Sequence, residues 1–325
     1  MKIKKPLTDE KMTNNLTSLK QILFSRNLFK PFVFELAPKL RDEQLLSAWT
    51  PDQIEFSRDK MQAVQHNIQT MPHLWRILQF FTQADLNVQN GQATLLFDLF
   101  EGAPELLGMV ATFSAIESVH AEAYAKFIDI VGADEAFYSS FESVPVFREL
   151  TEISKTEDIH DIRSLFKAFL YRYLAQEGVF LFTFFVLLLS FYKELNLFAG
   201  LEEVVRYSMR DELLHVQGIR HVILTLDKLH GGIVGIWNGI AQDEELQILS
   251  LQDKVIEYIF GDLKEINCIT KQTLRDYAEY NFNSSCKFSP PKQSKHPMPW
   301  VRDYFQENHL DLFAHKTSIY LNVKC

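Results

Sequence analysis

Cysteine is scarce in this sequence. Its 325 residues include three, Cys268, Cys286 and Cys325, and all lie in the last fifth of the chain. No two of them form a Cys-x-x-Cys pair, which argues against a thiolate metal site. So few cysteines without a paired motif are typical of a reducing compartment. We therefore expect a cytoplasmic protein.

Glycine and proline are also few, at 12 and 11 residues, and basic residues are fewer than acidic ones. A chain of this length could form two domains, but so few glycines and prolines mark no obvious linker, and we expect one large domain. The formal net charge is −9, and no basic stripe compensates for it. This balance argues against binding to a nucleic-acid backbone.

Long hydrophobic runs are missing as well. The first twenty residues are polar and lack the apolar centre of a signal peptide. The one membrane-like run, 179–192, is too short to cross a bilayer and begins next to Glu177 and Gly178. Because 47% of the residues are hydrophobic, the chain can bury a deep core. We expect this run to be a helix buried on all sides and not a membrane span.

What the sequence does contain is helical periodicity, and little in it indicates paired strands, so we expect an all-α fold. Order should begin near Asp42, where Leu45, Leu46 and Trp49 lie at helical spacing before Pro51. Before it we expect a flexible or irregular arm over 1–40, then a helical domain over 41–286 and an extended tail over 287–325. The expected helices cover 72–100 (with an irregularity at residue 91), 104–132, 162–197, 201–229, 241–260 and 270–282, with shorter helices and loops over 133–161.

The stretch from Glu117 to Tyr124 is the most informative part of the chain. On an α-helix, Glu117, His120 and Tyr124 lie on one face, because residues three and seven positions further on return to the same side. This face therefore presents a carboxylate, an imidazole and an oxidisable phenol. A second Glu-x-x-His follows at Glu212 and His215. The two motifs together predict two helices that each offer a carboxylate and an imidazole to a metal.

A single Glu-x-x-His is a weak signal, because chance gives about one match in a chain of this length. A third match, from Glu157 to His160, stands among charged residues, and we expect it to be solvated. Apolar residues surround the other two. Carboxylates are rarely buried without an opposite charge or a metal. Buried salt bridges are the weaker explanation, because Lys and Arg are scarce in these segments apart from Arg210.

Two further acids complete a ligand set. Helical bundles that hold a carboxylate-bridged metal pair take a Glu from each of two helices and a Glu-x-x-His from each of two others. Asp85 and Glu177 fit the single-acid roles in the chain order acid, Glu-x-x-His, acid, Glu-x-x-His. Four carboxylates and two imidazoles suit iron or manganese. The predicted ligands are Asp85, Glu117, His120, Glu177, Glu212 and His215.

From about Gln44 to the C-terminus, the chain resembles the small, radical-generating subunit of class I ribonucleotide reductase. The segments that carry the resemblance are Trp49-Thr50-Pro51, Ser57-Arg58-Asp59, the Glu117 to Tyr124 stretch, Glu177-Gly178-Val179-Phe180, Arg210-Asp211-Glu212-Leu213-Leu214-His215 and Pro297-Met298-Pro299-Trp300. The resemblance implies a ferritin-like helical bundle, usually a homodimer, with a dinuclear metal site in its core. It implies two metal ions per chain, Fe/Fe first and Mn/Mn or Mn/Fe as alternatives, and a flavoprotein activator if manganese is used.

The resemblance also implies roles for individual residues. The metal pair would react with oxygen or a reduced oxygen species and oxidise Tyr124 to a tyrosyl radical. The oxidising equivalent would pass through Trp49 and Asp211 to a large subunit, which reduces ribonucleotides, with Tyr320 in the tail as the exit. Two departures stand out: the gap from Asp85 to the next ligand is one residue longer than usual, which we place in the turn at 101–104, and Ser208 replaces a usually apolar residue near the radical.

Other interpretations remain at this point. Tyr124 and Trp49 can be ordinary core aromatics, and Asp211 can be an acid on a helix surface. A ferritin-like oxidase or desaturase that acts alone on an organic substrate would share the six ligands without needing Trp49, Asp211 or an exit tyrosine. A metal-free scaffolding bundle is the alternative that is not an enzyme.

Overall fold

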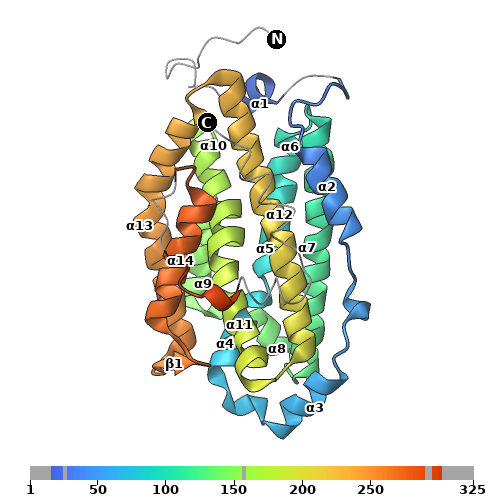
Figure 1. Cartoon of the computed structure of the whole chain (residues 1–325), viewed down its shortest axis with the longest axis vertical. Helices are drawn as coiled ribbons and strands as arrows, with labels where there is room; N and C mark the ends of the chain where they lie inside the picture. The colour runs from blue at the N-terminus through green and yellow to red at the C-terminus, as the bar shows by residue number, and fades with distance from the viewer. Residues whose placement is uncertain (1–15, 25–27, 156–158, 290–294, 302–325) are drawn as a thin grey trace.

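The computed structural model describes residues 16–24, 28–155, 159–289 and 295–301. In these residues the chain is a bundle of long helices that run along the longest axis of the molecule (Figure 1). The helices are α1 (Leu16–Leu23), α2 (Ala37–Leu46), α3 (Ser57–Gln65), α4 (Pro72–Phe81), α5 (Ala84–Gly91), α6 (Phe97–Leu99), α7 (Pro104–Ile130), α8 (Glu135–Ser139), α9 (Pro145–Ser154), α10 (Ile162–Phe169), α11 (Leu181–Leu195), α12 (Ala199–His230), α13 (Ile233–Phe260) and α14 (Lys271–Cys286).

Short elements complete the architecture. Two π-helical segments, Gln92–Leu96 and Leu170–Phe180, lie in line with the α-helices on either side of them. Three single turns of 3-10 helix lie at Pro51–Gln53, Ile68–Thr70 and Ser140–Ser143. The strands β1 (Glu265–Ile266) and β2 (Ile269–Thr270) form one small antiparallel hairpin, in which residue 265 pairs with 270 and 266 with 269. The expectation of an all-α fold is therefore confirmed for the described residues.

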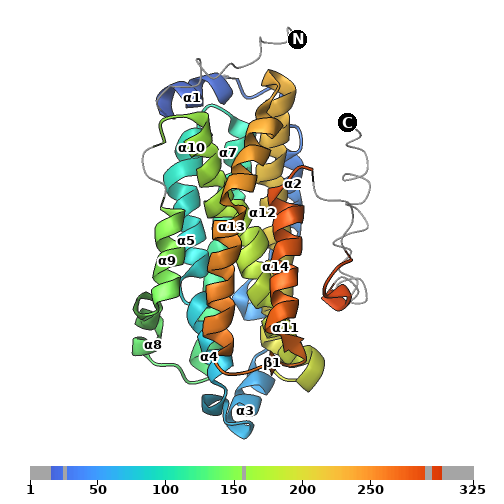
Figure 2. The same ribbon diagram turned by 90° about the vertical axis from the view of Figure 1, so that its left-hand side faces the viewer.

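The inner helices of the bundle are α5, α7, α12 and the α10–α11 column. Helix α7 packs against α5 and α12, and the π-helical segment 170–180 packs against α12 and α14. Helices α13 and α14 lie side by side outside this column (Figure 2). One continuous hydrophobic core fills the interior and includes side chains from nearly every helix. Any polar side chain on the inner faces of α5, α7 and α12 is thus far from solvent.

Several helix boundaries follow from local signals. Pro104 occupies the first turn of α7, where a missing backbone N–H costs nothing. Asp161 caps α10 by accepting a hydrogen bond from the backbone N–H of Ser164 at 2.7 Å. Helix α12 ends at Gly231, whose φ of 72° is a conformation that glycine adopts readily. These boundaries agree with the ones predicted from the sequence.

The N-terminal arm needs a correction. Residues 16–23 form α1 and α2 begins at Ala37, although we expected residues 1–40 to be flexible or irregular. Phe24 and Phe34, 0% and 1% exposed, pack into the core, and Phe24 contacts Phe100 with ring centroids 5.0 Å apart. This burial holds the segment against the bundle, and weak periodicity did not reveal it. Trp49, conversely, follows α2 and is not on a helix.

Two more differences concern the C-terminal half. Helix α13 begins at Ile233, eight residues before the expected start, because Ile233 and Trp237 are fully buried and extend its apolar face. Helix α14 continues to Cys286, which is also buried. Of the tail, residues 287–289 and 295–301 are described. The predicted exit residue Tyr320 lies outside the described residues.

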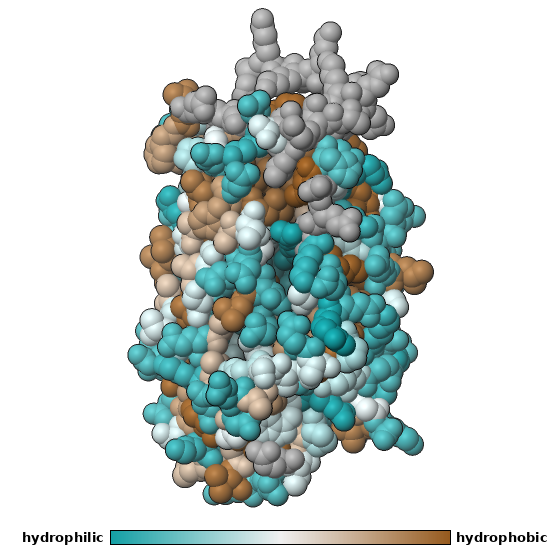
Figure 3. Space-filling view, turned by 180° about the vertical axis from the view of Figure 1, so that it is seen from behind, coloured by the Kyte–Doolittle hydropathy of each residue, from teal (hydrophilic) through white to brown (hydrophobic). Residues whose placement is uncertain are grey.

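The most apolar helical column is a core element. Residues Ile162–Leu195 are long and apolar enough to cross a membrane, but 94% of the apolar window is buried inside the bundle. The molecular face in Figure 3 is mainly hydrophilic across its middle, with hydrophobic side chains gathered near its upper end. Burial within protein therefore accounts for this run, as predicted.

The start of α12 is fixed by a buried acid. The Asp59 carboxylate, 0% exposed, accepts hydrogen bonds from the backbone N–H groups of Gly200 and Leu201, each at 3.0 Å. Burial raises the pKa of Asp59, and these two hydrogen bonds oppose that rise. Gly200 has no room for a side chain, because a Cβ there would lie 2.6 Å from a ring carbon of Phe56. Asp59 and Gly200 together fix where α12 begins.

We predict that Asp59→Ala lowers the free energy of unfolding by about 1–3 kcal/mol, because two buried amide groups lose their acceptor. Asp59→Asn keeps one acceptor oxygen and should lose less. Urea denaturation followed by circular dichroism measures both. An Asp59→Ala protein within about 0.5 kcal/mol of the unsubstituted protein would contradict this role.

Candidate metal centre

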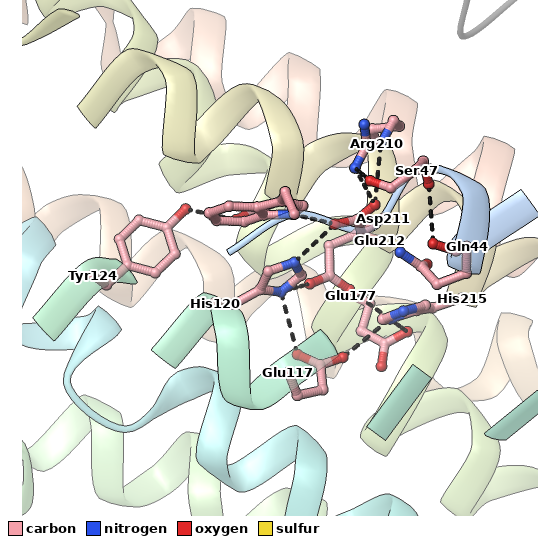
Figure 4. Close-up of polar contacts among 12 residues, drawn as sticks. Gln44, Ser47, Glu117, His120, Tyr124, Glu177, Arg210, Asp211, Glu212 and His215 are labelled. Atoms are coloured by element: carbon pink, nitrogen blue, oxygen red, sulfur yellow. Dashed lines mark hydrogen bonds and ion pairs between the residues drawn. The ribbon is translucent and has the colours of Figure 1, made fainter. Parts of the chain in front are cut away.

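The six predicted ligands meet in the centre of the bundle. Asp85 comes from α5, Glu117 and His120 from α7, Glu177 from the π-helical segment 170–180, and Glu212 and His215 from α12. Each is at most 1% exposed. Five of them are labelled in Figure 4, which shows their side chains converging from separate helices. The structure thus brings the six residues together, and their role as metal ligands stays a prediction.

Local structure explains how each helix presents its ligands. The two Glu-x-x-His pairs each lie one turn apart on a regular α-helix, so their side chains share a face. Glu177 lies on a π-helical segment, and such wide turns are frequent at functional sites. The other π-helical segment, 92–96, lies between Asp85 and Glu117 and can absorb one extra residue. It is therefore an alternative to the turn at 101–104 as the place of the longer gap.

The donors form two groups that share two carboxylates. Asp85, Glu117, His120 and Glu212 offer one atom each within 4.8 Å of one another, and so do Glu117, Glu177, Glu212 and His215. Glu117 and Glu212 belong to both groups, as bridging ligands of a metal pair do. Each group then has one terminal acid and one imidazole.

Both imidazoles point their Nδ1 atoms at the shared acids. His120 Nδ1 lies 3.5 Å from Glu117 and 3.3 Å from Glu212, and His215 Nδ1 lies 3.0 Å from Glu117 and 3.2 Å from Glu212. Many donor atoms nevertheless have no hydrogen-bond partner in the described part of the chain. They include both carboxylate oxygens of Asp85, Glu177 and Glu212. Buried polar atoms without partners are costly, and metal ions would satisfy them.

Electrostatics at the centre follow from burial and from the excess of acids. Burial raises the pKa of Asp85 and Glu177 well above the usual carboxyl value, and the neighbouring acids add to the rise. Burial also acts to raise the pKa of Glu117, but hydrogen bonds from His120 and His215 outweigh it and the pKa falls. Burial alone would lower the imidazole pKa values, yet the surrounding carboxylates raise both.

The donor set fits metal ions better than a network of salt bridges. In the described residues, five of the six side chains form ion pairs with one another or with Asp211, Asp85 forms none, and none of the six pairs with Lys or Arg. Arg210 pairs with Asp211, which is not one of the six. Four carboxylates and two imidazoles match the preferences of iron and manganese. The salt-bridge alternative therefore lacks its cations.

A hydrogen-bonded chain leads from the centre toward the surface. His120 Nε2 lies 3.2 Å from Asp211 Oδ2, and the same oxygen accepts a hydrogen bond from the Trp49 indole N–H at 2.9 Å. Arg210 donates to the other oxygen of Asp211 and, at 2.6 Å, to the backbone carbonyl of Ser47. His120, Arg210 and the indole lower the pKa of Asp211 against the opposing effect of burial. Asp211 is thus a buried carboxylate and not a surface acid.

Tyr124 lies in an aromatic pocket beside the centre. It is 0% exposed, and its ring stacks on Phe81 with centroids 4.4 Å apart. Phe185 in turn stacks on Phe81, with centroids 5.7 Å apart. The phenol donates to Ser208 Oγ at 3.4 Å, which is long for a hydroxyl hydrogen bond. Burial, with the charge of Asp85, raises the pKa of Tyr124, so the phenol keeps its proton.

Two buried amides near the centre were not predicted from the sequence. The Gln92 amide lies 3.4 Å from Glu117 Oε1, and the side chain of Gln44 has no hydrogen-bond partner in the described residues. Figure 4 shows Gln44 at the same end of the site as His215. Gln92 lies two helical turns after Asp85, a spacing that could have revealed it. In the third Glu-x-x-His, Glu157 lies outside the described residues and His160 is exposed.

Fold and site together define a class. A helical bundle in which four elements supply two single acids and two Glu-x-x-His pairs matches the ferritin-like proteins, whose bundles hold a dinuclear metal site between such residues. The family is more specific. The sequence model of the family "Ribonucleotide reductase, small chain" matches residues 26–288, and the chain belongs to this family.

Known proteins agree with this membership. The chain is 25% identical to the probable ribonucleoside-diphosphate reductase small subunit of Invertebrate iridescent virus 3, over 92% of this chain and 85% of that one. Among solved structures, a ribonucleotide reductase R2 subunit from Clostridium botulinum matches with a TM-score of 0.73, covering 86% of this chain and 92% of that one at 17% identity. An R2-like ligand-binding oxidase with a reconstituted Mn/Fe cofactor matches with a TM-score of 0.59 at 18% identity, covering 77% and 92%.

We predict about two metal ions per chain after loading with iron or manganese. In the metal-free protein the raised imidazole pKa values mean that the folded state holds these protons more tightly than the unfolded state. Stability should therefore fall as the pH rises above 6.5, the ordinary imidazole value. Metal ions replace these protons, so loading should raise the melting temperature more at alkaline than at slightly acidic pH.

Metal analysis and scanning calorimetry at several pH values measure both effects. A His160→Ala protein is the matched control, because His160 belongs to the exposed third motif and should bind metal as the unsubstituted protein does. Fewer than about one ion per chain would contradict the dinuclear site.

Proposed function

We propose that the chain is the small subunit of a class I ribonucleoside-diphosphate reductase and forms a tyrosyl radical at Tyr124. The observation that carries the proposal is the connection between the six-residue centre, a buried phenol and an indole. A buried phenol lies beside the centre, and His120 and Asp211 join the centre to Trp49 by hydrogen bonds. The centre thus has an oxidisable side chain beside it and a hydrogen-bonded path that leads outward. This arrangement suits an enzyme that oxidises a partner protein and not a substrate bound at the centre.

The metal ligands in this proposal are the six residues of the centre. When bound, a pair of iron or manganese ions supplies the oxidising equivalent, drawn from oxygen or a reduced oxygen species, that removes one electron from a phenol. Tyr124 would lose its phenolic proton with that electron and become a neutral radical. The ring is 0% exposed and stacks on Phe81, so water and reductants are kept from it, which favours a long-lived radical.

Asp211 has a positioning role in this scheme. Its Oδ2 atom accepts the Trp49 indole hydrogen and faces His120, while Arg210 holds its Oδ1 atom. The carboxylate therefore keeps the indole and the imidazole in fixed orientation, with ring centroids 6.0 Å apart. An electron that moves from Trp49 toward the centre leaves a cationic indole beside a carboxylate, which stabilises that charge.

The proposal includes partners. A large catalytic subunit would bind and reduce ribonucleotides, and the tail with Tyr320 would carry the oxidising equivalent to it. We further propose a homodimer in the cytoplasm, with Fe/Fe as the first choice of metal pair. Mn/Mn or Mn/Fe are the alternatives, and a flavoprotein activator would accompany manganese. The ligand types alone suit either metal.

A ferritin-like oxidase that acts alone is the second candidate, because R2-like ligand-binding oxidases share the fold. It would oxidise an added organic substrate without a partner protein. Such an enzyme has no use for the buried hydrogen bond between Trp49 and Asp211. Turnover of ribonucleoside diphosphates that requires a large subunit distinguishes the two.

We predict that Tyr124→Phe keeps both metal ions but loses the tyrosyl radical signal in electron paramagnetic resonance. The phenol oxygen contacts Ser208 and no metal ligand by hydrogen bond, so its removal should leave the donor set intact. Tyr173→Phe is the matched control, since Tyr173 is another buried tyrosine, bonded to the Gly91 carbonyl, and should keep the signal. An unchanged signal in Tyr124→Phe would refute the assignment.

We predict that Trp49→Phe and Tyr320→Phe keep the Tyr124 radical and lower turnover with the large subunit by about a hundredfold or more, since each removes one step of transfer. Trp75→Phe is the control for Trp49, because the Trp75 indole donates to the Ile68 carbonyl and lies outside the path. Single-turnover assays paired with resonance spectra measure both quantities. Full turnover in either variant removes that residue from the route.

A further inference from the structure

Trp49 has an aromatic neighbour on its outer side. The Tyr207 ring lies 5.3 Å from the Trp49 ring, centroid to centroid, with the planes tilted by 48°. Tyr207 is on α12, one turn before Asp211, and is partly exposed, whereas Trp49 is 5% and His120 is 0% exposed. The rings of His120, Trp49 and Tyr207 therefore form a series that leads from the metal centre toward solvent.

The phenol of Tyr207 has a proton acceptor in place. Its hydroxyl donates to Glu203 Oε1 at 2.8 Å, and the Glu203 side chain is 32% exposed. The two residues are one helical turn apart on α12, so a regular backbone holds the pair together. Oxidation of a phenol releases its proton, and a carboxylate in hydrogen-bond contact can take that proton without any movement of the chain.

Two cations flank the same ring. The guanidinium carbons of Arg206 and Arg210 lie 5.0 and 5.2 Å from the Tyr207 ring centroid. Arg206 is also paired with Glu202 at 3.1 Å and lies 3.7 Å from Glu203. Positive charge beside the ring opposes a cationic phenol radical. Oxidation at this position is therefore favourable only when the proton leaves with the electron, and Glu203 supplies the base for it.

We propose that Tyr207 is a relay residue between Trp49 and the partner subunit. The inference rests on the proposed function, in which the Tyr124 radical oxidises Trp49. In the added step, the cationic Trp49 radical takes one electron from Tyr207, and the Tyr207 hydroxyl proton moves to Glu203 Oε1. The products are a neutral Trp49, a neutral Tyr207 phenoxyl radical and a protonated Glu203. An electron from the partner then reaches Tyr207 by way of Tyr320, the exit residue of the proposed route, and Glu203 returns the proton.

A packing role is the competing explanation, because the Tyr207 ring contacts Trp49. Packing predicts that Tyr207→Phe, which keeps the ring, is neutral. A relay predicts that the same change lowers turnover with the large subunit about tenfold or more. Glu203→Gln keeps an acceptor oxygen but removes the base, so it should also lower turnover and leave the Tyr124 radical intact.

The direct test traps the radical. Tyr207 is replaced by 3-aminotyrosine, which is easier to oxidise, and the loaded protein is mixed with its large subunit and a ribonucleoside diphosphate. We expect an aminotyrosyl radical in electron paramagnetic resonance, formed as the Tyr124 signal declines and lost when Trp49→Phe is added. The matched control is 3-aminotyrosine at position 138, because Tyr138 is also partly buried and donates to a carboxylate, Asp129, at 2.6 Å. That control should give no radical.

The outcomes separate the two levels of inference. If the unsubstituted protein turns over and the aminotyrosine at 207 stays silent, or Tyr207→Phe keeps full turnover, the relay is refuted and the proposed function stands. If the unsubstituted protein forms no Tyr124 radical, the proposed function fails and the relay fails with it. A radical at position 207 that persists when Trp49→Phe is added also refutes the relay, because the oxidising equivalent then reaches position 207 without passing through Trp49.

Discussion

Four carboxylates buried among apolar helices are the constraint on which the rest of this structure depends. Asp85, Glu117, Glu177 and Glu212 are at most 1% exposed, and in the described residues only two imidazoles oppose their charge directly. Burying charge without compensation is among the largest penalties that a fold can bear. The raised pKa values of two of these acids express that penalty in the metal-free state. The interior is therefore organised for added cations, and the long apolar column at 162–195 supplies the low-dielectric surroundings that make them bind.

Helix α12 connects the metal centre to everything around it. Ser208, Asp211, Glu212 and His215 follow the helical spacing i, i+3, i+4 and i+7, so one face contacts Tyr124, Trp49 and both donor groups. A rotation of this helix would disturb all of these contacts at once. The buried carboxylate that receives the first amides of α12 and the close approach at Gly200 oppose such a rotation. Helices α7 and α12 are regular, and they define the site between them. The π-helical segment 170–180 adds Glu177 to this site.

The sequence contained much of the site, because helical periodicity determines which side chains share a face. Glu117 with His120 and Glu212 with His215 could be paired from spacing alone, the ligand order of dinuclear bundles pointed to Asp85 and Glu177, and family resemblance pointed to Trp49. Other features depend on contacts between distant segments, which periodicity does not encode. The contact between Phe24 and Phe100 stabilises α1. The contact between Tyr207 and Trp49 forms because the chain after α2 lies against α12. An irregularity was expected at residue 91, next to the π-helical segment 92–96, but the segment 170–180 escaped prediction because its mostly apolar sequence does not reveal a small shift in helical period.

The two halves of the centre are not equivalent, and the difference bears on how the site would work. The outer nitrogen of His120 faces Asp211, whereas that of His215 has no hydrogen-bond partner in the described residues. The half that contains His120 also contains Asp85, whose charge acts on Tyr124. The same half of the site thus adjoins both Tyr124, the proposed radical site, and Trp49, the start of the proposed path outward. The Glu177 and His215 half has neither neighbour, so in the proposed scheme it would only hold its ion and balance charge across Glu117 and Glu212. Oxidation of Tyr124 and its later reduction through Trp49 would then act at one end of the centre, and the radical would not have to cross the metal pair to leave.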